Sequence, residues 1–164
     1  MIKKISLIFL SIFFILSNGC SGYKPIYSNS NLEFKIVDYA IKGDKRLGNR
    51  IYSKLYNLSR TKKNLDSDKS IILLIDTSLN KNETSKDSSG KVLEYKLTLI
   101  AKIEILDFLS NDLILNQAFV SSLSYKVQSQ YSETIKLENR TIDNLLNKTY
   151  QDLLIKISET ILTK

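Results

Sequence analysis

Residues 93–105 constrain the possible fold more than any other segment of the sequence. Apolar side chains occupy every second position, namely Leu93, Tyr95, Leu97, Leu99, Ala101, Ile103 and Ile105. The positions between them are largely polar. A period of two predicts a strand with one buried face and one polar face. With its flanks this strand has about 15 residues and a length of roughly 50 Å, whereas most strands have about 5–6 residues.

A second long strand and a long helix are expected to match this strand. A turn at 109–112 leads into a strand at 113–127, which has Phe119, Leu123, Tyr125 and Val127 on one face. From residue 132 to the end, apolar residues recur at spacings of three and four, with no Gly or Pro. This pattern predicts a helix of about 30 residues, roughly 45 Å long. A helix of that length can pack along the hairpin.

The rest of the chain after residue 31 completes one α+β domain, 32–164. Its other expected elements are a strand at 32–36, a helix at 45–59, a charged loop at 60–69, a strand at 70–79 and an exposed polar loop at 81–90. Asp44, directly after Gly43, is the expected N-cap of the first helix. The order β-α-β-β-β-α predicts a two-layer sandwich, in which a four-stranded sheet with a long hairpin packs against two helices.

The first twenty residues are typical of an export signal that ends at a cysteine. Lys3 and Lys4 precede an apolar run at 5–16, and small or polar residues separate this run from Cys20. The run is shorter than the stretch of about 20 apolar residues that spans a bilayer. We therefore interpret 1–19 as a signal peptide.

Cys20 is the only cysteine, and its position after Gly19 resembles the lipobox of bacterial lipoproteins, although Ser17 stands where that motif usually has Leu. In such proteins the cysteine begins the mature chain and carries acyl chains such as palmitate. Several acyl chains, at about 0.8 kcal/mol per buried methylene, anchor a protein firmly. Ser21, rather than Asp, after the cysteine implies delivery to the outer membrane of a Gram-negative cell. The alternative is an ordinary signal peptide followed by a free buried cysteine.

The composition argues against most catalytic and metal-binding functions. The chain has no His and one Cys, which excludes His-dependent catalysis, His-ligated zinc or haem, and multi-thiolate metal sites. It contains no glycine-rich phosphate-binding motif. The remaining catalytic candidates, Asp66 with Asp68 and Ser88 with Lys91, lie in expected loops with ordinary turn chemistry. We therefore expect no enzyme activity, no metal and no cofactor beyond the lipid on Cys20.

The segment after the cysteine carries the sharpest resemblance to a known family. Cys20-Ser21-Gly22-Tyr23-Lys24-Pro25-Ile26-Tyr27 is similar to a Cys-Gly-[Phe/Tyr]-[Arg/Lys]-Pro-[Leu/Ile]-Tyr run in the LptE family of lipopolysaccharide-assembly lipoproteins, with Ser21 inserted. Asp87 and Gly90, followed by the alternating strand, the hairpin and the long last helix, resemble the same family in order and length. The resemblance covers essentially all of the chain after residue 19.

This resemblance implies a non-catalytic role in the cell envelope. Members of the LptE family plug the lumen of the outer-membrane β-barrel LptD, help it to assemble and assist the transport of lipopolysaccharide to the cell surface. They are lipid-anchored in the outer membrane on its periplasmic side, and they bind lipopolysaccharide through basic residues. The expected partners are therefore an LptD-type barrel, lipopolysaccharide and the membrane itself.

Basic and aromatic residues are the candidate binding residues. The lysines that flank the expected hairpin are predicted to contact lipopolysaccharide phosphates, with Lys62 and Lys63 as a weaker cluster; they are Lys81, Lys86, Lys91 and Lys126. Four residues of the tether 20–31 are predicted to lie at the membrane interface or the barrel wall: Tyr23, Lys24, Pro25 and Tyr27. The alternatives are lysines that are only solvated and tyrosines that pack as the first edge of the domain.

Two other functions fit part of the sequence. A generic outer-membrane lipoprotein binding module, for example a pilotin that escorts another envelope assembly, would share the signal peptide and the basic charge. A nucleic-acid binder is suggested only by the net charge of +7 and the pI near 9.3. Lys3 and Lys4 leave with the signal peptide, and no basic-aromatic motif is present, so we expect no nucleic-acid partner.

Overall fold

The computed structural model describes residues 34–61 and 69–162, which belong to one compact unit. Its elements, in chain order, are β1 (Lys35–Gly43), α2 (Lys45–Thr61), β2 (Ser70–Lys86), β3 (Val92–Asp107), β4 (Leu113–Lys126) and α3 (Tyr131–Leu162). The expected signal peptide 1–19, the tether 20–31 and the weaker cluster of Lys62 and Lys63 lie outside the described residues.

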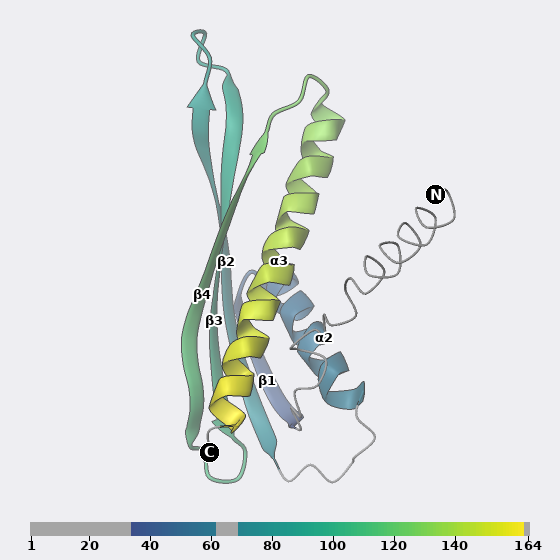
Figure 1. Cartoon of the computed structure of the whole chain (residues 1–164), viewed down its shortest axis with the longest axis vertical. Helices are drawn as coiled ribbons and strands as arrows, with labels where there is room; N and C mark the ends of the chain where they lie inside the picture. Colours follow the sequence, from purple (N-terminus) through teal and green to yellow (C-terminus); the bar gives the residue numbers. More distant parts are fainter. Residues whose placement is uncertain (1–33, 62–68, 163–164) are drawn as a thin grey trace, which may run out of the picture. The chain divides into compact units, whose positions relative to one another are not determined.

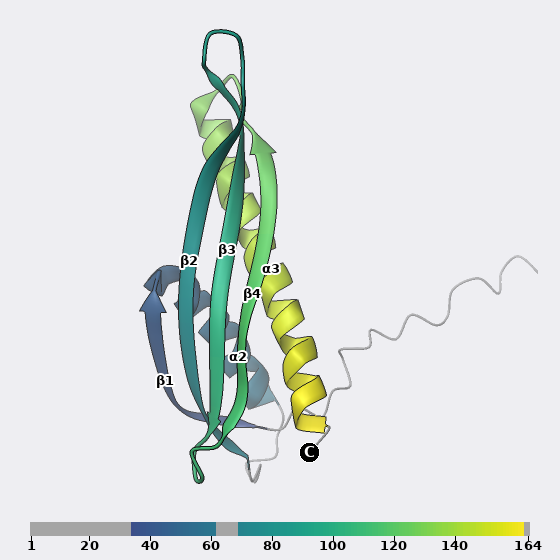
Figure 2. The same ribbon diagram turned by 90° about the vertical axis from the view of Figure 1, so that its left-hand side faces the viewer.

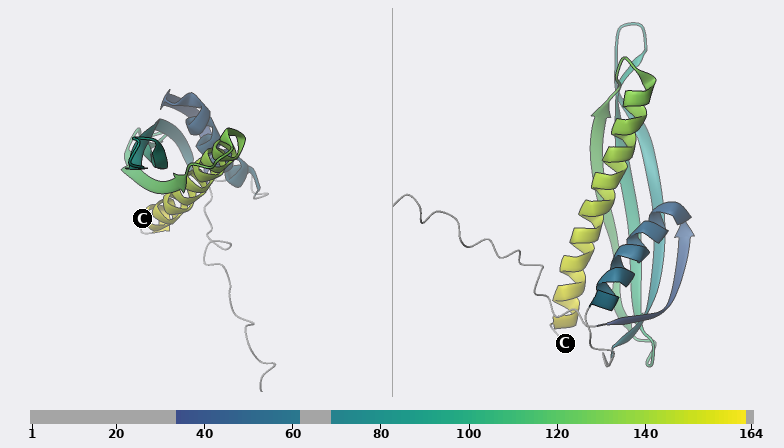
Figure 3. Two further views of the ribbon diagram at one scale, coloured as in Figure 1. Left: turned by 90° about the horizontal axis from the view of Figure 1, so that it is seen from above. Right: turned by 90° about the vertical axis from the view of Figure 1, so that its right-hand side faces the viewer.

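The four strands form one sheet in the order β1-β2-β3-β4 (Figure 2). β1 and β2 pair in parallel, as the helical crossover between them allows, and the other neighbours are antiparallel. Both helices lie on one face of the sheet, which curves around α3 (Figure 1, Figure 3). The predicted two-layer α+β fold, with the order β-α-β-β-β-α, is therefore confirmed.

The junction between β1 and α2 is held against β2 by hydrogen bonds. Gly43 has a positive φ of 69°, where the chain turns out of the strand. The Asp44 carboxylate accepts hydrogen bonds from the backbone N–H groups of Arg46 and Leu47, at 3.0 and 3.1 Å, so the predicted N-cap is confirmed. Asp44 also donates its own N–H to the carbonyl oxygen of Thr77 at 2.7 Å, and the Thr77 hydroxyl donates to the carbonyl oxygen of Asp44 at 2.8 Å.

Two strands are longer than the sequence indicates. β1 extends to Gly43, whereas the predicted strand ends at residue 36. β2 continues to Lys86, so the prediction of a loop at 81–90 is wrong for 81–86; these residues are exposed, as expected, but they pair with β3. This part of β2 has no apolar alternation because its conformation depends on backbone pairing with β3 rather than on its own burial.

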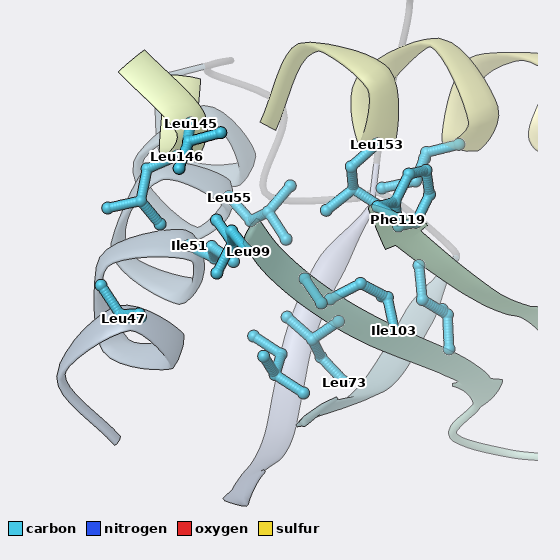
Figure 4. Close-up of a cluster of buried hydrophobic side chains, with 14 of the residues drawn as sticks. Leu47, Ile51, Leu55, Leu73, Leu99, Ile103, Phe119, Leu145, Leu146 and Leu153 are labelled. Carbon is cyan, nitrogen blue, oxygen red and sulfur yellow. The ribbon is translucent and has the colours of Figure 1, made fainter. Parts of the chain in front are cut away.

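The core lies between the inner face of the sheet and the two helices (Figure 4). The helices bury leucine and isoleucine side chains at helical spacing, among them Leu47, Ile51 and Leu55 of α2 and Leu145, Leu146 and Leu153 of α3. The inner face of β3 buries the residues that the alternation predicts from Leu97 onward: Leu97, Leu99, Ala101, Ile103 and Ile105. Each fully buried leucine or isoleucine contributes about 1.5–3 kcal/mol, so this layer holds helices and sheet together.

Candidate functional site

The predicted binding lysines lie near the end of the β2–β3 hairpin, which extends past the start of α3 (Figure 1). Asp87 holds the turn there: its carboxylate accepts hydrogen bonds from the Ser89 hydroxyl and from the backbone N–H groups of Ser89 and Lys91, at 2.7–2.9 Å. These hydrogen bonds, with that of the Ser89 side chain the strongest, hold the pKa of Asp87 below its usual value. Lys91 is therefore presented from a turn of defined geometry.

A partly buried ion pair joins the hairpin to α3. Lys81 Nζ lies 2.6 Å from Glu138 Oε2, and the Tyr125 hydroxyl donates to the same oxygen at 2.7 Å. The Lys81 ammonium group lies over the rings of Tyr95 and Tyr125, 4.4 and 5.6 Å from their centroids. These two rings stack with their centroids 5.8 Å apart. We call these four residues the Lys81 cluster; it links β2, β3, β4 and α3.

The environment of the Lys81 cluster favours the charged forms of Glu138 and Lys81. Burial alone would raise the pKa of Glu138, but the hydrogen bonds from Lys81 and Tyr125 and the charge of Lys81 outweigh it and lower that pKa. Burial alone would lower the pKa of Lys81, but hydrogen bonds and charge from Glu138 and Tyr125 outweigh it and raise that pKa. Lys81 is therefore engaged within the fold and does not present a free cation to an external phosphate.

We expect Glu138→Gln to lower the free energy of unfolding by about 1–2 kcal/mol at neutral pH, because the largely buried carboxylate of Glu138 loses its charged contacts with Lys81 and Tyr125. The matched control is Glu133→Gln in the first turn of α3. It removes an exposed ion pair with Lys136 and should cost at most about 0.5 kcal/mol. Urea unfolding followed by circular dichroism measures both differences.

The Glu138 contribution also has a defined pH dependence. Since its pKa is lowered in the folded state, the stabilisation is fully present above the ordinary value of 4.5 and is lost as the pH falls through the lower folded-state value. The difference between the unchanged protein and Glu138→Gln should therefore shrink in acid. A difference that stays constant with pH, or that equals the effect of Glu133→Gln, would contradict this role.

The other three predicted lysines do not join the Lys81 cluster. Lys86 forms an ion pair with Glu83 at 2.6 Å, and this contact raises the pKa of Lys86. Lys126 is the register partner of Glu94, and because it follows Tyr125 it lies on the opposite face of the sheet. Within the described part of the chain, neither Lys91 nor Lys126 forms an ion pair. The four lysines thus lie near one end of the sheet without forming one cluster.

Apolar side chains are exposed near Lys91, on the inner face of the strands. Leu93 and Leu123 are 44% and 38% exposed, although both belong to the alternation that forms the core further along the strands. Lys91 lies two residues before Leu93. Cations next to uncovered leucines suit a ligand that has both anionic groups and apolar chains.

The outer face of the sheet is a second candidate surface, because neither α2 nor α3 covers it (Figure 3). By register, polar side chains form two rows across β2, β3 and β4, namely Asn80–Thr98–Ser122 and Asn82–Lys96–Ser124. The Thr98 and Ser122 hydroxyls lie 2.9 Å apart and share a hydrogen bond. A further row, Lys42–Asp76–Lys102, alternates in charge and borders a hollow of about 350 Å³ over Ala40 and Leu74. The predicted polar face of the long strand is therefore uncovered and available to a partner.

Sequence reasoning missed Glu138 as the partner of Lys81. The two residues are 57 positions apart, so no local spacing indicates the contact. Sequence reasoning also placed Lys81 in a loop, whereas strand pairing aims its side chain at α3. The opposite orientation of Lys126 could have been inferred, because Tyr125 was already predicted to share one strand face with Phe119, and its neighbour must point to the other face.

Several predictions concern residues or groups that the structure does not test. Cys20 and the tether residues Tyr23, Lys24, Pro25 and Tyr27 lie outside the described residues, so their roles stay predictions.

Within the described ranges, no group of three or more His, Cys, Asp or Glu side chains could hold a metal ion. Neither α2 nor α3 contains an apolar stretch that could span a bilayer.

Comparisons with known proteins establish the fold. No protein-family model and no curated protein matches the sequence, but several solved structures are similar. The solution structure of uncharacterized lipoprotein B from Nitrosomonas europaea has a TM-score of 0.60 and 20% sequence identity, over 79% of this chain and 85% of that one. The crystal structure of a minor lipoprotein from Acinetobacter baumannii has a TM-score of 0.54 and 14% identity, over 76% of this chain and 91% of that one. Each similarity covers most of both chains.

Proposed function

We propose that this protein is an outer-membrane lipoprotein of the LptE type, anchored on the periplasmic side through acylated Cys20. It plugs an LptD-type β-barrel and assists the transport of lipopolysaccharide, without catalytic activity. The observation that carries the proposal is a long sheet whose uncovered face carries rows of polar side chains, built on a fold that the chain shares with two solved lipoproteins. The Cys20 motif and the resemblance of residues 20–27 to the LptE family support it.

The uncovered face suits the interior of a large outer-membrane barrel. Such interiors are lined by polar side chains, because the residues of barrel strands alternate between lipid and lumen. The rows that contain Thr98 and Lys96 offer hydroxyl, amide and ammonium groups that could form hydrogen bonds with a barrel wall. A mixed row such as Lys42–Asp76–Lys102 can pair with either sign of charge.

The end of the hairpin suits lipopolysaccharide. Lipid A carries phosphates and acyl chains, which match Lys91 and the exposed Leu93, while Lys126 offers a second cation on the opposite face of the sheet. Within the described residues neither lysine forms an ion pair. Lys81 and Lys86 contribute less in this proposal, because Glu138 and Glu83 already neutralise them. The predicted set of four phosphate contacts is thereby reduced to two principal ones.

We expect Cys20→Ala to abolish palmitate incorporation and to leave 1–19 attached, because Cys20 is the only thiol in the chain. Labelling with radioactive palmitate and the intact mass of the purified chain measure both effects. Ser21→Ala is the matched control, which keeps the thiol and should be labelled like the unchanged protein. An unchanged chain that carries no acyl group would contradict the anchor.

The barrel partner is tested by purifying the tagged full chain from detergent-solubilised outer membranes. An LptD-type barrel should co-purify in an equimolar amount. Recovery of a barrel of very different size would instead favour the alternative of a pilotin for another envelope assembly. Recovery without any barrel would contradict the plug.

A further inference from the structure

Within the described residues the sheet ends at β1 and β4, and these two edge strands differ in how they are protected against further pairing (Figure 2). β1 carries three charged residues, and its register with β2 shifts between Ile36 and Asp38. β4 has no charged residue and no Pro over 113–125, and its register with β3 is regular over 115–126. Charges, prolines and irregular register are the usual means by which edge strands avoid pairing with another chain. β4 therefore lacks the protection that β1 has.

Alternate residues of β4 present their backbone groups to the open edge. The N–H of Val127 donates to the carbonyl oxygen of Leu93 at 2.9 Å, which fixes the phase of the β3–β4 ladder. In an antiparallel pair every second residue bonds to the neighbouring strand, and the residues between them point the other way. The odd-numbered residues over 115–125 therefore bond to β3. The backbone N–H and C=O groups of five residues point to the edge: Asn116, Ala118, Val120, Ser122 and Ser124.

A hollow of about 370 Å³ lies between this edge and α3. It is bordered by residues 117–120 of β4 and by Asp152, Ile155, Lys156 and Glu159 of α3. Lys156 and Glu159 form an ion pair at 3.1 Å, whereas Asp152 forms no ion pair within the described residues. The edge thus has room for side chains beside it and an acidic group that faces this room.

These features fit a peptide in an extended conformation that carries a basic side chain. Its backbone would pair with the five edge-facing residues, and its alternate side chains would enter the hollow, where a Lys or Arg meets Asp152. Pairing between the β4 strands of two copies of this chain fits less well. The second copy would bring no cation to Asp152, because β4 is uncharged over 113–125.

We propose that β4 is a strand-addition site, at which an extended segment of the partner barrel's chain pairs with the edge and sets a Lys or Arg against Asp152. The inference rests on the proposed function and adds how the plug and the barrel are joined. Strands within a closed barrel wall have no free edge, so the segment is a loop or a chain end that enters the lumen. In strand addition, main-chain hydrogen bonds contribute affinity, and contacts of alternate side chains contribute specificity.

The basic residue is tested by Asp152→Asn. Loss of the carboxylate should raise the dissociation rate of the barrel from the immobilised full chain about tenfold, because a lost charge pair acts mainly on dissociation. Asp112→Asn, which removes an exposed carboxylate from the β3–β4 turn, is the control with the same change of charge and should leave the rate unchanged. Equal rates for the two variants would contradict a basic residue opposite Asp152.

Amide hydrogen exchange in the co-purified complex tests the strand pairing itself. The amides of the five edge-facing residues should exchange at least about tenfold more slowly in the complex than in the isolated full chain, because each forms a new hydrogen bond. Mass spectrometry with fragmentation that resolves neighbouring amides measures the rates. The odd-numbered amides over 115–125 are the internal control, since they are already bonded to β3 and should exchange slowly in both samples.

Three outcomes of this experiment would overturn the inference, each in a different way. Edge amides that exchange equally fast in the complex and in the isolated chain would overturn strand addition and leave the plug intact, since a water-filled lumen does not protect unbonded amides. Slow, concentration-dependent exchange of the same amides in the isolated chain would show that a second copy, rather than the barrel, covers the edge. A preparation that contains no barrel would overturn the proposed function, and the inference with it.

Discussion

Replacement of Gly43 by alanine is expected to lower the free energy of unfolding by at least about 3 kcal/mol. Gly43 has φ of 69°, a region that disfavours side chains. A Cβ atom built on Gly43 would lie 2.1 Å from the carbonyl oxygen of Thr77 and 2.8 Å from the Asp76 carboxylate. The same carbonyl oxygen accepts the hydrogen bond from Asp44 that holds the start of α2. Relief of the clash would therefore separate α2 from the sheet.

Gly90→Ala is the matched control for this substitution. Gly90 also has a positive φ, of 84°, but a Cβ atom there would have no atom within 4 Å. Gly90→Ala should therefore lower the free energy of unfolding by only about 1 kcal/mol, which is the cost of a side chain at a positive φ. Urea unfolding of both variants measures the difference. Equal losses at the two glycines would show that the contact with Thr77 has no energetic weight.

Charge reversal at the two unpaired lysines of the hairpin end should weaken lipopolysaccharide binding at least about tenfold, because each cation near an anionic lipid surface contributes about 1 kcal/mol. The variant is Lys91→Glu with Lys126→Glu. Within the described residues neither lysine forms an ion pair, but Lys126 is the register partner of Glu94, so urea unfolding of the double variant must first show that the fold is kept. Lys81 is left unchanged, since its reversal would place a carboxylate against Glu138.

Lys45→Glu with Lys148→Glu is the control of equal net charge. Both residues are exposed on helices, at the start of α2 and in the middle of α3. Binding of purified lipopolysaccharide to the immobilised full chain measures the effect. If both double variants lose affinity equally, the net charge rather than the hairpin end attracts the ligand, and the assignment of Lys91 and Lys126 is wrong.

The elements that were predicted correctly have strong local periodicity. The inner face of β3 repeats every second residue from Leu97 to Ile105, and α3 repeats at threes and fours, so each pattern specifies its own secondary structure. The end of β2 was missed because 81–86 is polar on both faces and becomes a strand only through its register with β3. Local sequence carries no signal for a pairing of that kind.

The contacts of the candidate lysines could not be predicted from the sequence. The lysines near the hairpin were recognised by charge, yet the role of each depends on residues far away in the chain. Glu138 comes from α3 and reaches Lys81 only after β2, β3, β4 and the helix have packed. Likewise, the sequence predicts β4 as a strand, but its place at the edge of the sheet becomes visible only when the four strands have paired.

Site-specific photocrosslinking in living cells tests the plug most directly. A photoreactive residue at Val120 samples the uncovered outer face of the sheet, where this side chain is exposed, and one at Asn144 samples the exposed surface of α3. A chain inside a barrel lumen is surrounded by barrel wall, so both positions should capture the same LptD-type barrel after irradiation. Irradiation that captures no outer-membrane barrel from either position would contradict the plug and leave only the lipoprotein anchor to be tested.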